Sequence, residues 1–97
     1  MDDASFFQSI IGLLGEINDD ASAVAALNDP VTGPEINLFD AGLLRSLTVV
    51  RLLRAMEEYF NVQVPVEQYG MEAFFTLRSI RRMMEPLLVA EGRVGVT

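Results

Sequence analysis

The sequence contains no cysteine, histidine, tryptophan or lysine. The absence of cysteine excludes a disulfide scaffold, a thiolate metal site and a cysteine nucleophile. The absence of histidine excludes Ser-His-Asp catalysis and removes the commonest zinc ligand. We therefore expect no metal site and no catalytic residue, and we predict that the protein is not an enzyme.

Long apolar runs are absent too, so we expect no membrane insertion. The start of the chain, Met1 to Asp3, is acidic where a secretory signal needs positive charge. The 97 residues, 51% of them apolar, fit one small domain with a single core. We expect a monomeric cytoplasmic protein with a single domain over residues 1–90 and a flexible C-terminal tail over residues 91–97, where two glycines occur.

Basic residues are few and unevenly placed. The chain has 14 acidic residues and 7 arginines, which gives a formal net charge of −7. Residues 1–44 carry eight acids and no base, whereas residues 45–97 carry all seven arginines and six acids. Because no basic face spans the chain, we expect no nucleic-acid binding. The arginines are still suited to contact an acidic protein locally.

Residues 4–17 predict a helix, preceded by Asp2 or Asp3 as a capping residue. Polar residues 18–20 then interrupt the pattern, and the alanine-rich stretch 21–27 fits either a separate helix or a bent continuation of the first. The apolar side chains spaced for one face of the first helix are Phe6, Phe7, Ile10, Ile11, Leu13, Leu14 and Ile17.

A long loop is expected over residues 28–45. Residues 28–30 and 32–34 are turn signals that each end in proline. A loop of this length in a small domain is usually functional or held by its side chains. The apolar residues available to anchor it are Ile36, Leu38, Phe39, Leu43 and Leu44.

The clearest helix runs from Ser46 to Phe60. Ser46 is the expected N-cap, and no glycine or proline follows before Pro65. In the polar strip of this helix, Arg54 lies at pairing distance from Glu57 or Glu58. The apolar residues expected to share one side are Leu47, Val50, Leu53, Met56 and Phe60, of which the last four are expected to include core anchors. This side is widened by Val49, Leu52 and Tyr59.

The remaining sequence predicts a short helix and a last long one. Asn61 suits a left-handed residue at the end of the preceding helix. Residues 67–75 fit one short helical turn broken at Gly70, and Thr76 suits the cap of a helix over residues 77–90. Pro86 lies inside that last helix and is expected to kink or end it. Four methionines are expected to be core filler: Met56, Met71, Met83 and Met84.

One stretch carries a chemical motif. Gly42 is suited to a tight turn, Leu43 and Leu44 can lie under the bundle, and Ser46 stands at the start of a helix. This stretch resembles the attachment-site motif of acyl and peptidyl carrier proteins. The run from Leu38 to Leu44 is most similar to the stand-alone D-alanyl carrier type, in which a leucine, a phenylalanine, an acid, a variable residue, a glycine and two leucines precede the serine.

The resemblance extends beyond the motif. Glu57 to Phe60, followed by Val62 to Pro65, is similar to the segment that ends the second helix in this family. In all it covers roughly residues 36–90. It implies an all-α, four-helix carrier-protein bundle with a short third helix and a long loop between helices one and two. It also implies a discrete acyl or aminoacyl carrier that moves its cargo between enzymes.

The resemblance further implies that Ser46 carries a covalent 4′-phosphopantetheine arm, whose thiol holds the cargo as a thioester. The implied partners are a phosphopantetheinyl transferase, an acyl- or aminoacyl-activating ligase and a downstream transferase. A chain without cysteine has no thiol of its own, so a borrowed thiol suits it. A serine at a helix N-terminus is also exposed, and the nearby N–H groups favour a phosphodiester.

The sequence departs from the family pattern immediately before the serine. The family nearly always has aspartate there, whereas this chain has Arg45. With Arg51 and Arg54, Arg45 is predicted to form a basic edge on the helix that the family usually presents to partners. The expected partner-binding residues are Arg45, Leu47, Val50, Arg51 and Arg54, and their partner is expected to bear acidic groups. An alternative is an unmodified, carrier-like scaffold or regulatory module that uses the same face.

Overall fold

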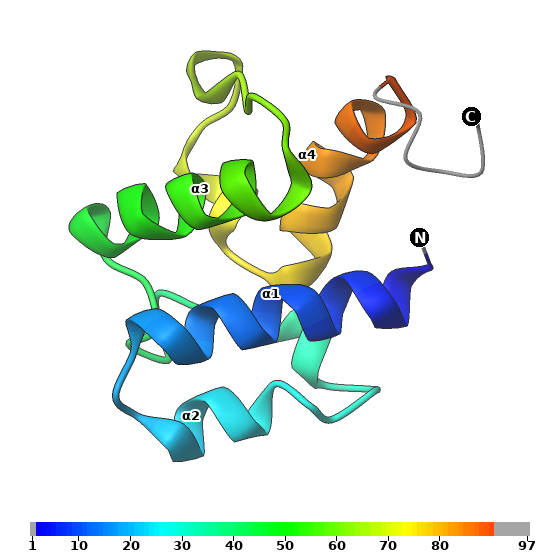
Figure 1. Cartoon of the computed structure of the whole chain (residues 1–97). Coiled ribbons are helices and arrows are strands. Elements are labelled where there is room, and N and C mark those ends of the chain that lie inside the picture. Colours follow the sequence, from blue (N-terminus) through cyan, green and yellow to red (C-terminus); the bar gives the residue numbers. More distant parts are fainter. Residues whose placement is uncertain (1, 91–97) are drawn as a thin grey trace.

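The computed structural model describes residues 2–90, apart from the side chains of Val89 and Ala90. The regular elements of this part of the chain are all helical, as predicted (Figure 1). The predicted tail over residues 91–97 lies outside the described residues. The elements are α1 (Asp3–Ile17), α2 (Ala21–Ala26), η1 (Gly33–Glu35), α3 (Ser46–Phe60), η2 (Val66–Gln68), η3 (Met71–Phe74) and α4 (Leu77–Ala90), where η denotes a 3-10 helix.

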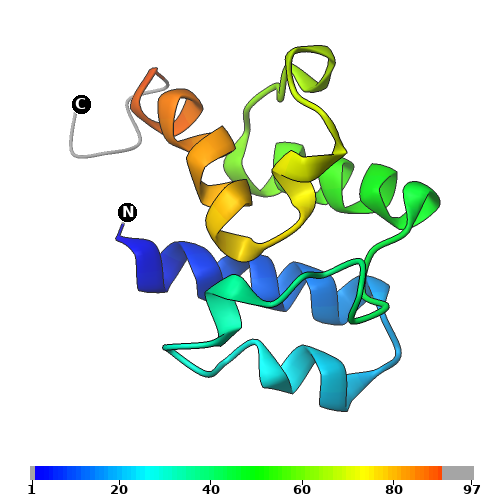
Figure 2. The ribbon, with the colours of Figure 1, turned by 180° about the vertical axis from the view of Figure 1, so that it is seen from behind.

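Helix α1 is the centre of the bundle. It contacts α2, α3 and α4, and both views show α2 and α3 on opposite sides of it (Figures 1 and 2). The beginning of α4 contacts both η1 and η3, so the long loop is held against the last helix (Figure 2). The predicted all-α four-helix bundle is thus confirmed, with α2 as an additional short helix and 3-10 turns in place of the short third helix.

Two aspartates start the first two helices. The Asp2 carboxylate accepts a hydrogen bond from the backbone N–H of Ser5 at 2.8 Å, which lowers the pKa of Asp2 below its ordinary value. Helix α1 ends at Ile17, and the Asp20 carboxylate then accepts a hydrogen bond from the N–H of Ala23 at 3.0 Å. Because α2 has its own cap, it is a separate helix and not a continuation of α1.

Side chains and backbone hydrogen bonds hold the long loop as predicted. The Leu38 carbonyl accepts hydrogen bonds from the N–H groups of Leu43 and Leu44, and the Leu38 N–H donates to the carbonyl of Phe75. These three leucines are buried, while Ile36 is partly buried. The loop is therefore part of the core between α1 and α4.

The buried face of α3 differs from the prediction. Met56 and Phe60 are buried as expected, but Leu47 and Val50 are 72% and 52% exposed. The other buried residues of α3 are Val49 and Leu52, while Leu53 is only partly buried. Both apolar stripes satisfy the helical repeat, and only packing against α1 decides which of them faces inward.

The C-terminal half confirms the predicted helix boundaries, including a last helix over residues 77–90. Asn61 adopts the left-handed conformation, with φ 55° and ψ 52°, at the end of α3. Thr76 caps α4, because its hydroxyl oxygen accepts a hydrogen bond from the N–H of Ser79 at 3.0 Å. Pro86 does not end α4, which continues to Ala90. Proline has no backbone N–H, so one hydrogen bond of the helix is missing at Pro86, whose ring is exposed. The packing of the buried face of α4 keeps the last turn helical.

Two smaller predictions are wrong. Met56, Met83 and Met84 are buried, but Met71 is 44% exposed and is not core filler. Arg54 forms no ion pair in the described part of the chain. The Glu57 carboxylate instead accepts a hydrogen bond from the backbone N–H of Val64 at 2.9 Å, which ties the segment after α3 back onto the helix.

Candidate functional site at the start of helix α3

A tight turn directs the chain into α3. The Asn37 side chain accepts hydrogen bonds from the N–H groups of Phe39 and Asp40 at 2.9 and 3.0 Å. Gly42 follows with a φ of +78°, a conformation that residues with a side chain rarely adopt. The chain is then extended at Arg45, so it leaves the core and reaches the surface immediately before Ser46.

Ser46 was predicted to be the N-cap of α3, but it is the first residue of the helix. Arg45 occupies the cap position, with φ −139° and ψ 171°, and no side chain caps the helix. The Ser46 side chain is exposed, and its hydroxyl makes no hydrogen bond within the described residues. The N–H groups of the first turn also lack a side-chain acceptor. The start of α3 therefore offers a free hydroxyl next to the positive end of a helix dipole.

A hollow of about 270 Å³ lies beside Ser46, between α3 and the η2–η3 segment. It is open to solvent and mainly apolar, and the exposed side chain of Met71 forms part of its wall. Its lining residues are Ser46, Val49, Val50, Leu53, Val66, Tyr69, Gly70, Met71 and Phe74.

The structure confirms a short helical segment broken at Gly70, but the position of residues 66–74 as a wall beside Ser46 was not predicted from the sequence. Its two 3-10 turns are only three and four residues long, too short for a helical repeat to be recognised. Met71 was misassigned to the core for the same reason. In the sequence, only the apolar residues that follow Pro65 could have indicated this wall.

The three arginines of the predicted basic edge are all exposed. Arg45, Arg51 and Arg54 form no ion pairs in the described structure, whereas Arg78 pairs with Glu35. Their charges are therefore not neutralised within residues 2–90. Leu47 and Val50 are exposed on the same helix, so all five predicted partner-binding residues are accessible at the surface.

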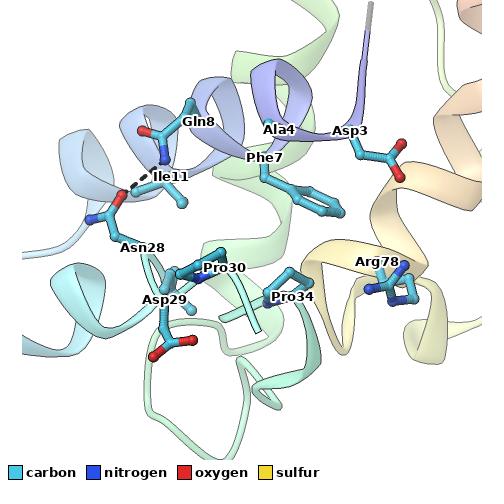
Figure 3. Close-up of a pocket in the computed structure, with 11 residues that line it drawn as sticks. Asp3, Ala4, Phe7, Gln8, Ile11, Asn28, Asp29, Pro30, Pro34 and Arg78 are labelled. Carbon is cyan, nitrogen blue, oxygen red and sulfur yellow. Dashed lines mark hydrogen bonds between the residues drawn. The ribbon is translucent and has the colours of Figure 1, made fainter. Parts of the chain in front are cut away.

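Another hollow, of about 320 Å³, lies between α1, the loop and the start of α4. Figure 3 shows the Phe7 ring pointing into it, with Pro30 and Pro34 opposite and Arg78 at one end. The amide of Gln8 donates a hydrogen bond to Asn28 across its rim at 3.0 Å. It shares no lining residue with the hollow beside Ser46, so it is a separate feature.

Two other kinds of site are absent from the described residues. No group of three or more aspartate, glutamate, histidine or cysteine side chains in residues 2–90 is arranged to hold a metal ion. None of the helices in this part of the chain has the length and apolar character of a membrane span.

An exposed serine that starts the second long helix of an all-α bundle, beside an open apolar hollow, is suited to covalent attachment of a group that stays accessible to other proteins. These features define a carrier protein. The model of the phosphopantetheine attachment site family matches residues 7–85, and the chain belongs to this family. The match favours the carrier function over the unmodified scaffold.

Several relatives are D-alanyl carrier proteins. The one from Bacillus licheniformis is 29% identical over 82 residues, which cover 84% of this chain and 96% of the relative. The one from Streptococcus equi subsp. zooepidemicus is 41% identical over 51 residues, which cover 53% of this chain and 65% of the relative. One from Streptococcus pyogenes is 39% identical over a segment of the same length. No solved structure matches the chain significantly.

The cofactor of this family is covalent 4′-phosphopantetheine, which supplies a thiol that holds the cargo as a thioester. The residues present fit such a group. The free hydroxyl of Ser46 would provide an attachment atom, and the uncapped N–H groups of α3 would suit a phosphodiester. The hollow beside Ser46 leaves room along the surface of α3.

Proposed function

We propose that Ser46 is the attachment site of 4′-phosphopantetheine and that the chain is an aminoacyl carrier. The observation that carries the proposal is the exposed Ser46 hydroxyl, free of hydrogen bonds, at the uncapped start of α3. The aminoacyl cargo is inferred from the D-alanyl carrier relatives, among which D-alanine is the specific candidate.

Each part of the site has a defined task in this proposal. The Ser46 oxygen attacks the pyrophosphate of coenzyme A and forms a phosphodiester, its proton is released, and 3′,5′-adenosine bisphosphate leaves. The N–H groups of the first turn of α3 stabilise the remaining phosphodiester charge. Both the attachment and the later acyl transfers are catalysed by partners, so the chain acts as a substrate shuttle and not as an enzyme.

The partners are a phosphopantetheinyl transferase, an aminoacyl-activating ligase and a downstream transferase, which the carrier meets as a cytoplasmic monomer. We further propose that they contact the basic edge of Arg45, Arg51 and Arg54 together with Leu47 and Val50. Support comes from the exposure of all five side chains and from the lack of internal ion pairs at the arginines. An apolar centre with unpaired positive charge suits a partner surface with acidic groups around an apolar patch.

The attachment is tested by the intact mass of the protein after incubation with coenzyme A and a broad-specificity phosphopantetheinyl transferase. The expected result is a gain of one phosphopantetheine in the wild type and none in Ser46→Ala. If the wild type gains nothing and Arg45→Asp gains one, Ser46 is competent and Arg45 excludes the general transferase. No gain in either protein contradicts the attachment.

The cargo is tested separately on the modified protein. Incubation with ATP and a D-alanine-activating ligase should add the mass of one alanyl group, which hydroxylamine should remove because it cleaves thioesters. Matched incubations with a fatty-acid-activating ligase and a medium-chain fatty acid should add nothing. Loading by the fatty acid alone would contradict the aminoacyl cargo while leaving the attachment site intact.

A further inference from the structure

Two hollows meet at Gly70. The hollow beside Ser46 is bordered by Tyr69 and Gly70, and the same two residues border a second hollow of about 360 Å³ on the side of α4. The second hollow also contains Glu72 and Arg82. An exposed surface path therefore leads from the Ser46 hydroxyl, past Gly70, to a pair of charged side chains.

The Glu72 carboxylate lies directly over Gly70. A Cβ atom placed on Gly70 would be 2.5 and 2.6 Å from its two oxygens, so only glycine leaves room for the carboxylate in this position. The backbone of Gly70 has a φ of −90°, which other residues adopt freely, so a side chain at this position would act through space alone, by turning the exposed Glu72 side chain away. An alanine at this position would displace the carboxylate from the junction of the hollows.

The same carboxylate has no partner in the described structure. It makes no hydrogen bond and no ion pair, not even with Arg82 in the same hollow. Glu72 is exposed, so its charge is available to a group that arrives from solvent. Tyr69 lines both hollows, so an aromatic side chain borders the same junction.

We infer that Glu72 and Tyr69 receive the ammonium group of an aminoacyl cargo held on Ser46, an inference that rests on the proposed function. An amino acid bound as a thioester has lost its carboxylate charge and keeps only its ammonium. A carboxylate attracts this cation, and an aromatic face adds to the attraction. A neutral acyl cargo gains nothing from Glu72, and a cargo that ends in a carboxylate is repelled by it.

Arg82 does not reverse this selectivity. It lines only the second hollow, whereas the Glu72 carboxylate rests on Gly70, which borders both. The Glu72 carboxylate is therefore placed at the border of the hollow beside Ser46, and no contact within residues 2–90 places Arg82 there. Arg82 lowers the affinity for a cation without removing it, so Arg82→Gln is expected to strengthen the attraction.

The test is the pKa of the cargo ammonium, measured by NMR on protein that carries ¹⁵N-labelled alanine. The alanine is joined to the arm by a stable amide and loaded from a coenzyme A analogue, with loading verified by intact mass. The chain has no histidine or cysteine, so no side chain of ordinary pKa titrates near that of the ammonium. We expect the ammonium pKa to be higher by about 0.5 in the wild type than in Glu72→Gln.

Glu67→Gln is the matched control, because it removes the same charge from an exposed residue that does not line the second hollow. Its ammonium pKa should equal that of the wild type. The alanyl arm should also shift the amide resonances of Gly70 and Glu72, whereas a propionyl arm should not.

The possible failures are distinguishable. Equal ammonium pKa values in the wild type and Glu72→Gln, with loading verified, overturn the role of Glu72 and leave the attachment site standing. Equal amide shifts with the alanyl and propionyl arms overturn it as well, because the hollow then receives the arm and not the ammonium. Absence of loading on Ser46 in both the wild type and Arg45→Asp overturns the proposed function and this inference together.

Discussion

Phe6 and Phe60 stack on each other in the core, with ring centroids 5.5 Å apart and ring planes 20° from parallel. The pair joins the first turns of α1 to the last residue of α3. The guanidinium of Arg81 on α4 lies over the Phe6 ring, 5.7 Å from its centroid. Three helices are thereby fixed at one end of α3, while Ser46 occupies the opposite, exposed end.

Truncation of Phe60 should therefore destabilise the fold strongly. Phe60 is 5% exposed, and Phe60→Ala is expected to lower the free energy of unfolding by about 3–5 kcal/mol. The measurement is equilibrium denaturation by urea. Phe75→Ala is the matched control, because Phe75 is 39% exposed and should cost clearly less. An unchanged midpoint in Phe60→Ala would remove this residue from the core.

The two ends of α3 were predictable to different degrees. Asn61 follows the last apolar residue of the helical repeat and tolerates the left-handed conformation of a helix end, which the structure confirms there. At the other end, the first residue was predicted within one position, but serine was assigned a capping role that Arg45 occupies with its backbone alone. The distinction matters for the chemistry of Ser46. A capping hydroxyl accepts a hydrogen bond from the backbone of the helix, whereas the hydroxyl observed here is free.

The buried face of α3 and the position of the wall beside Ser46 could not be predicted from the sequence for a different reason. Residues 46–60 carry two overlapping apolar stripes, and local spacing does not distinguish the one that packs on α1 from the one that faces solvent. The wall of residues 66–74 has no repeat to recognise and is positioned by contacts with α4. Both features depend on tertiary packing, which is also what places Val50 and Met71 at the surface.

Two glycines should respond to alanine in opposite directions. A Cβ atom at Gly42 or Gly12 would meet nothing within 4 Å, so neither substitution causes a steric clash. Gly42 has a φ of +78°, and Gly42→Ala is expected to destabilise the fold by about 1 kcal/mol. Gly12 is exposed within α1, and Gly12→Ala is expected to stabilise it by about 0.5–1 kcal/mol. Thermal unfolding of both variants checks the pair, and a shift of the same sign in both would refute the conformational argument.

Asp29 should stabilise the loop in a pH-dependent way. Hydrogen bonds from the N–H groups of Thr32 and Val31, at 3.0 and 2.8 Å, lower the pKa of its carboxylate below the ordinary 3.8. A lowered pKa means that the contribution is complete above the ordinary value and is lost as the pH falls through the folded-state value. Asp29→Ala should therefore have a lower Tm than the wild type at pH 7, and the difference should shrink below pH 3.8.

Asp40→Ala is the control for this titration, because the Asp40 carboxylate is exposed and accepts no hydrogen bond within the described residues. Its Tm should differ little from that of the wild type at any pH. A Tm difference for Asp29→Ala that stays constant from pH 7 to pH 2 would show that the carboxylate charge is not involved.

The basic edge of α3 should govern partner affinity through charge. Arg51 and Arg54 are exposed and unpaired, so their charges are available to acidic groups on the activating ligase. The double variant Arg51→Glu, Arg54→Glu is expected to raise the Kd of the modified carrier for this ligase by about tenfold or more. Added salt should raise the wild-type Kd as well, because exposed charges are screened.

A matched pair of single variants separates this local effect from net charge. Arg54→Glu and Arg82→Glu change the net charge equally, but Arg82 lies on α4 and not on α3. Isothermal titration should show weaker ligase binding for Arg54→Glu and nearly wild-type binding for Arg82→Glu. Equal losses would mean that the ligase responds to overall charge. Binding that is insensitive both to salt and to the double substitution would refute the role of the basic edge in ligase binding. The apolar pair of Leu47 and Val50 would then be the surface of α3 that the ligase contacts.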